Sequence, residues 1–458
     1  MTHSRTNDGG SGRATDGMTR KQFLKVGGAG LAGAALLGSG ALAGCGGGGG
    51  SGAGGGSGSI TFSWIPEQTG TLQKMIDRFN KENEDGIKVK FQEMPTDSTQ
   101  HFDKLRTQFQ AGSTDMDVIG GDVVWPAQFA APGYYLDLSD RFSESARNKF
   151  LPAPMQANTF KGKPYGVPWY TDSGMLYYRK DLLEKSGFSD PPKTWDELEQ
   201  MAKKVMQDSG TKYGFVFQGA QYEGGVCNGL EYIWTHGGDV LDPDNPNKVV
   251  VDSPGSIAGL AAERSMVDAG VAPGAVSSYK EQEAQTTFLN GDSVFMRNWP
   301  YIYGLAADES ESKVKQSKIG VAPLPVGKEG DSSFSALGGW NFSINAKSKN
   351  PDAAWSFIQY MTAPAQEKEF ALKTARIPAL KDLLDDQELV SKVPVIKLGK
   401  EAISRTRPRP VSAYYSDISL AMAKQFNSSL NGETSPKGAI KTLDSELKDI
   451  VKQGKSQE

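Results

Sequence analysis

Cysteine and histidine are nearly absent from this chain, which excludes several kinds of catalytic and metal site. The 458 residues include only two cysteines, Cys45 and Cys227, and three histidines, His3, His101 and His236. Two cysteines cannot build a disulfide framework or a thiolate zinc site. The histidines lie far apart in the sequence, so neither a histidine-rich metal site nor a Ser–His catalytic pair is indicated. We expect no metal and no cofactor, and we expect His101 and His236 to be ordinary residues of a helix surface or a loop.

The chain also lacks a basic excess and any long apolar run beyond its first 45 residues. Five of the 50 Lys and Arg and two of the 54 Asp and Glu precede residue 45, so the rest carries 45 against 52, a net charge of −7. Nucleic-acid binders normally carry the opposite excess. No later run approaches the roughly 18 apolar residues of a membrane-spanning helix. A chain of this length is too long for one hydrophobic core, so two domains are expected.

The first 44 residues have the order of a signal peptide. Basic Arg20, Lys21 and Lys25 precede a weakly apolar stretch from Val26 to Ala43, which small residues follow. The segment Thr19–Lys25 resembles a twin-arginine export motif with Lys in place of the second Arg. Either the twin-arginine or the general secretion route therefore stays open.

Cys45 stands between this segment and a run of almost pure glycine and serine. Leu42-Ala43-Gly44-Cys45 resembles a bacterial lipobox, which implies diacylglycerol on the Cys45 sulfur and cleavage just before it. Residues 45–58 then form a tether, since about fourteen Gly-rich residues span roughly 20 Å. We expect an exported protein that is lipid-anchored to the outer face of the cytoplasmic membrane.

From Ser59 onward, strand and helix patterns alternate with short loops. Apolar alternation indicates strands at Ile60–Trp64, Ile87–Met94 and Met116–Gly121, and amphipathic periodicity indicates helices at Thr71–Asn83 and Ser98–Phe109, the second capped by Ser98. This alternation predicts βαβ units with a parallel sheet.

Polar residues follow each of these three predicted strands. Glu67 comes after the first, Asp97 after the second and Asp122 after the third. In open α/β sheets, ligands bind outside the carboxyl ends of the strands. Loop-favouring residues alone could explain any one of these positions, but the three together favour a binding site.

Aromatic residues stand beside short polar residues in three later segments. Trp169 and Tyr170 precede Asp172, Asn298 precedes Trp299, and ALGGWNF places Trp340 after two glycines. Aromatic rings cover the C–H faces of a sugar while carboxylates and amides bind its hydroxyls. Core packing remains an alternative role for each tryptophan.

The carboxylates also permit a glycosidase, which needs two acids about 5–9.5 Å apart. The chain shows no local catalytic signature, and a lipid tether favours capture over turnover. We therefore expect a binding protein and not an enzyme.

Four segments carry a resemblance to a known family: GGDVVWPAQFAAPGYYLDLSD, YGVPWYTDSGMLYYRKDLL, FLNGDSVFMRNWPYIYG and LGGWNFSINAKSKNPDAAWSFIQYMT. With these four segments in this order, the chain resembles the extracellular solute-binding proteins of bacterial carbohydrate ABC importers. This class includes maltose- and trehalose-binding proteins. The resemblance implies a two-lobed α/β fold, each lobe a mostly parallel sheet flanked by helices, with the ligand in the cleft between them. It places lobe one at residues 59–168 plus 321–372 and lobe two at residues 169–320 plus 373–458.

The same resemblance implies a set of ligand-binding residues. They are the acidic Glu67 and Asp122 of lobe one, the hinge-proximal Tyr170 and Asp172, the stacking Trp299, the pair Gly339 and Trp340, and a clamping arginine, Arg409 in preference to Arg407. The lone Cys227 is expected to be a small buried packing residue.

The expected function is that of a monomeric substrate-binding lipoprotein. It would capture a disaccharide of the trehalose or maltose type and deliver it to a membrane permease. Three alternatives stay open: another ligand, either a longer oligosaccharide or a polyol phosphate; a secreted glycosidase-like protein; and a sensory sugar-binding lipoprotein.

Overall fold

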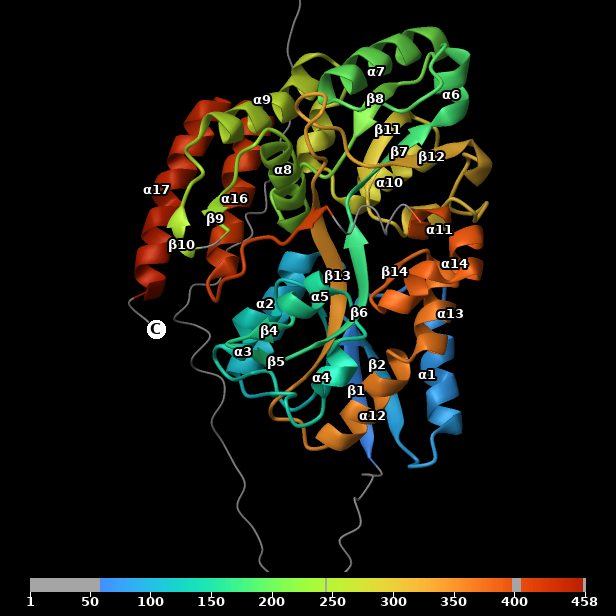
Figure 1. Ribbon diagram of the computed structural model, residues 1–458, viewed down its shortest axis with the longest axis vertical. Helices are drawn as coiled ribbons and strands as arrows, with labels where there is room; N and C mark the ends of the chain where they lie inside the picture. The colour runs from blue at the N-terminus through green and yellow to red at the C-terminus, as the bar shows by residue number, and fades with distance from the viewer. Residues whose placement is uncertain (1–57, 244, 398–404, 456–458) are drawn as a thin grey trace, which may run out of the picture. The chain divides into compact units, whose positions relative to one another are not determined.

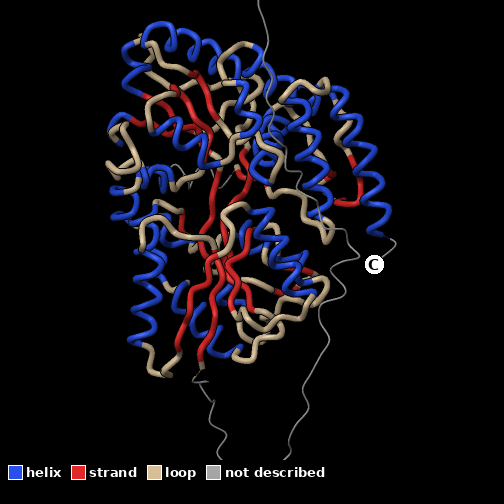
Figure 2. The backbone as a smooth tube through the Cα atoms, turned by 180° about the vertical axis from the view of Figure 1, so that it is seen from behind, coloured by secondary structure: helices blue, strands red, loops and turns tan. Residues whose placement is uncertain are grey.

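The folded part of the chain is built on two separate sheets, each flanked by helices (Figures 1 and 2). The computed structural model describes residues 58–243, 245–397 and 405–455, all of which belong to one compact unit. The expected signal peptide, Cys45 and all but the last residue of the expected tether lie outside the described residues.

The first sheet has seven strands in the order β14-β6-β13-β3-β1-β2, with β15 paired to β13. Its strands are β1 (Ser59–Trp64), β2 (Lys88–Glu93), β3 (Val118–Asp122), β6 (Val167–Ser173), β13 (Ser335–Ile344), β14 (Ile377–Pro378) and β15 (Thr406–Arg407). The second sheet has four strands in the order β12-β7-β11-β8. They are β7 (Met175–Arg179), β8 (Tyr213–Val216), β11 (Ser293–Asn298) and β12 (Ile319–Ala322).

The sequence pattern accounts for the parallel part of the first sheet. Ile60, Phe62 and Trp64 of β1 are all buried, and β1 pairs in parallel with both β2 and β3. The intervening helices α1 (Thr71–Glu82) and α2 (Ser98–Gln110) are the crossovers that parallel pairing requires. The predicted β1–α1–β2–α2–β3 order is therefore confirmed.

Both sheets are mixed, so the expectation of mostly parallel sheets was wrong even though the two-lobed α/β fold is confirmed. β13 runs antiparallel to β3 and β6, and β7 runs antiparallel to β11 and β12. β6 continues into β7 of the second sheet after the single residue Gly174. A chain that passes from one sheet to the other must also return, and the outgoing and returning strands then pair antiparallel.

Helices gather around each sheet (Figure 1). Those around the first sheet, besides α1 and α2, are α3 (Pro126–Ala130), α4 (Glu144–Arg147), α5 (Pro152–Ala157), α12 (Pro351–Met361), α13 (Pro364–Thr374), η3 (Lys381–Asp385) and α14 (Gln387–Lys392). Those around the second are α6 (Lys180–Lys185), α7 (Trp195–Ser209), α8 (Glu223–Thr235), α9 (Pro254–Asp268), η1 (Gly274–Ser278), α10 (Glu281–Leu289), α11 (Ile302–Leu305), η2 (Gln316–Lys318), α16 (Tyr415–Leu430) and α17 (Pro436–Lys455). Two hairpins, β4 (Thr159–Phe160) with β5 (Lys163–Pro164) and β9 (Leu241–Asp242) with β10 (Asn245–Val249), complete the described elements.

Three expectations about single residues can be compared with the structure. The cap of α2 is Asp97 and not Ser98, because the Asp97 side chain accepts a hydrogen bond from the Gln100 amide at 2.9 Å. Cys227 is buried in α8, as expected. In the described ranges, no helix combines the length and the apolar character needed to cross a membrane.

The expected lobe boundaries stay a prediction. Two short strands lie close to them: β12 spans the change at residue 321 and pairs in the second sheet, whereas β14, just beyond residue 372, pairs in the first.

A fully buried ion pair ties α8 to the second sheet. The Arg297 guanidinium donates to the Glu231 carboxylate through Nε at 2.8 Å and Nη2 at 2.5 Å. Oε1 of Glu231 also accepts from the amide of Ala336 in β13 at 3.0 Å. A side chain at Gly174 would place its Cβ only 2.2 Å from the same Oε1, so glycine is required there. The pair thus lies where β6 becomes β7.

We predict that Arg297→Met destabilises the protein by about 3–5 kcal/mol, because the buried Glu231 carboxylate loses its partner. The free energy of unfolding in urea measures this. Lys204→Met, which breaks an exposed i,i+4 pair with Asp208 in α7, is the control and should leave the urea midpoint unchanged. Equal midpoints for the two variants would contradict the prediction.

Candidate ligand-binding site

The carboxyl ends of β1, β2 and β3 meet at one edge of the first sheet because the three strands are parallel. Glu67, Asp97 and Asp122 follow or end these strands, so the sequence correctly placed three acidic residues at this edge. Polar side chains at such an edge form the usual binding position of an α/β sheet.

Strand register aligns further predicted site residues along the same edge. Trp340 of β13 pairs with Asp122 of β3 on one side and with Tyr170 of β6 on the other. Two residues along the same strands, Gly338 pairs with Asp172. Residues 122, 170, 172 and 340, far apart in the sequence, are therefore neighbours.

Two glycines let Trp299 and β6 approach β13 closely. A Cβ at Gly338 would lie 2.9 Å from Cζ3 of Trp299 and 3.0 Å from Cβ of Asp172. Gly339 has φ +118°, and a Cβ there would lie 2.4 Å from the carbonyl oxygen of Tyr170. Trp299, directly after β11, thus packs from the second sheet against Gly338 of the first, beside which Asp172 also lies.

Arg409 links this edge to the helices beside the second sheet. Its Nη2 donates to Oδ1 of Asp122 at 2.9 Å, and its Nη1 donates to Oε1 of Glu223 at 2.5 Å. The Glu223 carboxylate also accepts from the hydroxyls of Tyr415 and Ser419. Arg407 lies elsewhere and pairs with Asp239 at 3.4 Å, which supports Arg409 as the arginine of the site.

Two more polar contacts connect elements of the two sheets around the site. Asp97, the cap of α2, forms an ion pair with Lys280, which precedes α10. The Ser416 amide of α16 donates to Oε1 of Gln128 of α3 at 2.9 Å. The two sides of the site are therefore held together by direct polar contacts.

Asp172 has a buried carboxylate oxygen without a hydrogen-bond partner in the described part of the chain. That oxygen is Oδ1, and the residue as a whole is buried. Burial raises the pKa of Asp172 to about 7; Arg376 opposes that rise and Asp122 adds to it. Burial also raises the pKa of Asp122, while Arg409 lowers it. A buried acceptor without a partner is the group that a ligand hydroxyl would satisfy.

The Glu67 carboxylate is already hydrogen-bonded to the backbone of the protein. Its Oε1 accepts from the amide of Thr69 at 2.7 Å, and its Oε2 accepts from the amide of Thr71 at 2.9 Å. The side chain therefore caps the start of α1, and its role in ligand contact stays a prediction.

Trp340 lies in a cluster of aromatic rings. Its ring centroid is 5.7 Å from that of Trp64 and 5.6 Å from those of Trp125 and His101. The expectation for His101 was wrong: the imidazole is fully buried, and burial lowers its pKa to about 3, with a further contribution from Lys104. The helix face that bears His101 packs against these tryptophans, which the periodicity of α2 alone did not reveal.

Sequence analysis missed three charged residues of the site. Glu223 and Glu281 are the first residues of α8 and α10, and Arg376 follows α13. Glu281 accepts from the Tyr222 hydroxyl at 2.6 Å and from Nε1 of Trp299 at 3.4 Å, so it orients the tryptophan. No local motif marks these residues, because only the tertiary structure brings them to the site.

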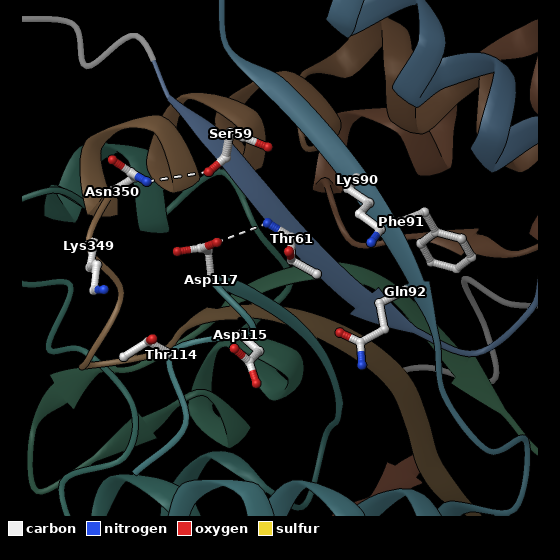
Figure 3. Close-up of a pocket in the computed structure, with 10 residues that line it drawn as sticks. All are labelled: Ser59, Thr61, Lys90, Phe91, Gln92, Thr114, Asp115, Asp117, Lys349 and Asn350. Atoms are coloured by element: carbon white, nitrogen blue, oxygen red, sulfur yellow. Dashed lines mark hydrogen bonds between the residues drawn. The ribbon is translucent and has the colours of Figure 1, made fainter. Parts of the chain in front are cut away.

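A separate cavity of about 630 Å³ lies near the amino-terminal half of β1, away from this edge (Figure 3). Its lining consists of Ser59, Thr61, Lys90, Phe91, Gln92, Thr114, Asp115, Asp117, Lys349 and Asn350. Two of its polar groups are satisfied within the lining, since Asp117 accepts from the Thr61 amide and Asn350 donates to the Ser59 carbonyl. None of the predicted site residues lines it.

We predict that Asp172 makes stability depend on pH. Because folding raises its pKa from 3.8 to about 7, only the folded state holds the proton between these values. The free energy of unfolding of the protein, relative to that of Asp172→Asn, should therefore fall as pH rises from about 4 to about 7 and then level off. Urea titrations across this range measure the difference, and a difference that does not vary with pH would contradict the prediction.

Comparison with known proteins agrees with this geometry. The sequence model of the bacterial extracellular solute-binding protein family matches residues 63–368. A probable ABC transporter-binding protein of Deinococcus radiodurans is 36% identical over 377 residues, which cover 81% of this chain and 88% of that protein.

Solved structures are similar over most of the folded part. The maltose-bound MalE3 protein of T. maritima is 39% identical, with a TM-score of 0.81 over 86% of this chain and 100% of that one. The GacH receptor of Streptomyces glaucescens is 26% identical, with a TM-score of 0.76 over 86% and 99%. Three findings agree: the family model matches two thirds of the chain, one relative is 36% identical, and the two-lobed fold is shared. This chain therefore belongs to the bacterial extracellular solute-binding protein family.

Proposed function

We propose that this protein is the sugar receptor of an ABC importer and that it captures a disaccharide of the trehalose or maltose type. The observation that carries the proposal is the buried Oδ1 of Asp172, which has no partner within the described ranges. Asp172 and Trp299 both lie against Gly338. The similarity to a structure described as maltose-bound, at 39% identity, supports the same ligand class.

The side chains around Asp172 suit a neutral, polyhydroxylated ligand. Asp122, Asp172 and Arg409 provide charged acceptors and donors for hydroxyls, and hydrogen bonds to charged groups are the stronger ones. Trp299 and Trp340 provide aromatic faces for the C–H side of a sugar ring.

The charge of the site argues against a phosphate-bearing ligand. Arg409 is already shared between Asp122 and Glu223, and Glu281 and Asp172 add two further carboxylates. A phosphate beside Asp122 would meet these carboxylates, and the guanidinium at that position, Arg409, is already paired twice. The site therefore favours a sugar over a polyol phosphate.

We propose binding without turnover. The Asp122 carboxylate is ion-paired with Arg409, so its Oδ1 is already engaged by a group of the protein. The matched family and the similar structures are those of binding proteins. An aryl glycoside should therefore bind without release of its phenol.

We further propose that the protein is exported, acts as a monomer and is anchored through lipid on Cys45. The family supports the extracellular location and the ABC transporter relative supports a permease as partner. The lipid anchor rests on the sequence LAGC at residues 42–45.

We predict that maltose or trehalose stabilises the mature protein. Trp299→Ala and Asp122→Ala should each weaken binding about 10- to 100-fold, because the first removes an aromatic face and the second a charged hydrogen bond. Calorimetry measures affinity, and at a hundredfold excess over the dissociation constant the ligand should add about 2.7 kcal/mol of stability. Asp115→Ala, at an exposed position in the separate cavity, is the control. If no sugar of a broad panel shifts the melting temperature, the proposal is wrong.

We predict that Cys45→Ser releases the protein from the membrane fraction. Without the thiol, no diacylglycerol can be attached, and a Gly/Ser tether has no membrane affinity of its own. Fractionation after expression in a bacterial host, with Cys227→Ser as the matched control, tests this. Retention of the Cys45→Ser protein on membranes would contradict the anchor.

A further inference from the structure

The guanidinium of Arg376 lies among four aromatic rings, one of them that of Tyr170. Its central carbon is 5.1 Å from the ring centroid of Tyr170, 5.3 Å from Phe370, 5.6 Å from Trp64 and 5.9 Å from Tyr301. Each distance falls within the range of a cation–π contact. Rings on all these sides hold the planar group in a fixed place.

The rings come from elements of both sheets. Trp64 and Tyr170 belong to β1 and β6 of the first sheet, whereas Tyr301 lies between β11 of the second sheet and α11. Arg376 stands between α13 and β14, and α13 contacts α11 (Figure 1). At Gly304 of α11, a Cβ would lie 3.2 Å from the carbonyl group of Thr374. The two sides of the site therefore meet closely at Arg376.

Neighbouring groups keep the guanidinium of Arg376 charged although it is buried. Burial by itself would lower the pKa of Arg376, but Tyr170 and the carboxylates of Asp172 and Glu67 raise it by more. Arg376 also opposes the rise in the pKa of Asp172. Arg376 is therefore a charged neighbour of Asp172.

Beyond Arg376 there is almost no free space. The cavity there measures about 10 Å³ and is lined by Glu67, Gln68, Thr69, Tyr301, Gly304, Leu305, Thr374 and Arg376. Such a volume holds about one water molecule. Small-molecule pockets usually measure about 300–1,000 Å³, so no sugar ring fits past the guanidinium.

We propose that Arg376 is the end wall of the ligand cleft and sets the length of the sugar that this receptor accepts. The proposal rests on the proposed sugar-binding function and adds a specificity determinant to it. Ligand rings lie between Arg376 and Arg409, over Asp172, and an additional ring on the Arg376 side collides with the guanidinium. Substitution by a small residue opens the cleft towards Glu67 and Thr69.

The length series of maltose, maltotriose and maltotetraose tests the wall first in the unmodified protein. Calorimetry should give an affinity for maltotetraose at least about tenfold below that for maltose, the order of discrimination that steric exclusion from a packed pocket provides. Equal affinities would overturn the end wall while leaving the sugar-receptor function intact. Absence of binding to every sugar would instead overturn the proposed function, and the end wall with it.

The variants Arg376→Ala and Arg376→Met then separate size from charge. Arg376→Ala should raise the ratio of maltotetraose to maltose affinity about tenfold, because the space of the guanidinium becomes free. Arg376→Met keeps a long side chain without charge and should keep the ratio of the unmodified protein. Arg78→Ala is the matched control. It removes an arginine of α1 that pairs with Glu369 of α13.

An unchanged ratio in Arg376→Ala, with a melting temperature near that of the control, would overturn the proposal. A ratio that rises equally in Arg376→Met would also overturn it, since charge and not size would then set the ligand length. The length series of the unmodified protein decides the matter if Arg376→Ala does not fold.

Discussion

The arrangement of the site depends on one buried guanidinium, that of Arg409. A buried charge is strongly unfavourable unless it is paired. Burial lowers the pKa of Arg409, and Asp122 and Glu223 raise it by more, so the group stays charged. Because Asp122 ends a strand of the first sheet and Glu223 begins α8 beside the second, the electrostatic requirement of one residue draws both sides together.

The same requirement explains why the remaining polar groups are unevenly satisfied. Glu223 accepts from Arg409, Tyr415 and Ser419, and Glu67 accepts from the first amides of α1. Asp172 has neither an ion pair nor a helix start to accept from, and its Oδ1 stays without a partner in the part of the chain that the structure describes. Among the acidic residues named here, Asp172 is therefore the one that keeps a buried oxygen open to a further donor.

Local patterns predicted what local physics decides. The alternation in Ile60–Trp64 and the apolar periodicity of Thr71–Asn83 gave β1 and α1 within a residue or two, and the order of strands placed Glu67, Asp97 and Asp122 at one edge. Antiparallel crossing by β6 and β13 could not be read locally, because it follows from the route of the chain between two sheets. His101, Glu281 and Arg376 were missed for a related reason: their surroundings consist of residues more than fifteen positions away or on other elements. The family resemblance named residues 122, 170, 172, 299, 340 and 409 together. It could not reveal that the Glu67 carboxylate accepts hydrogen bonds from the first amides of α1.

The direct passage of β6 into β7 has a mechanical consequence. Tyr170 and Asp172 lie on the strand that, one residue after Ser173, becomes part of the second sheet. Gly174, between the two strands, packs directly against the Glu231–Arg297 pair, so its backbone has no room to move towards that pair. A twist of one sheet relative to the other must therefore pass through the backbone that carries the Asp172 carboxylate. The position of Asp172 is therefore coupled to the angle between the lobes. A ligand that fixes one of them also fixes the other.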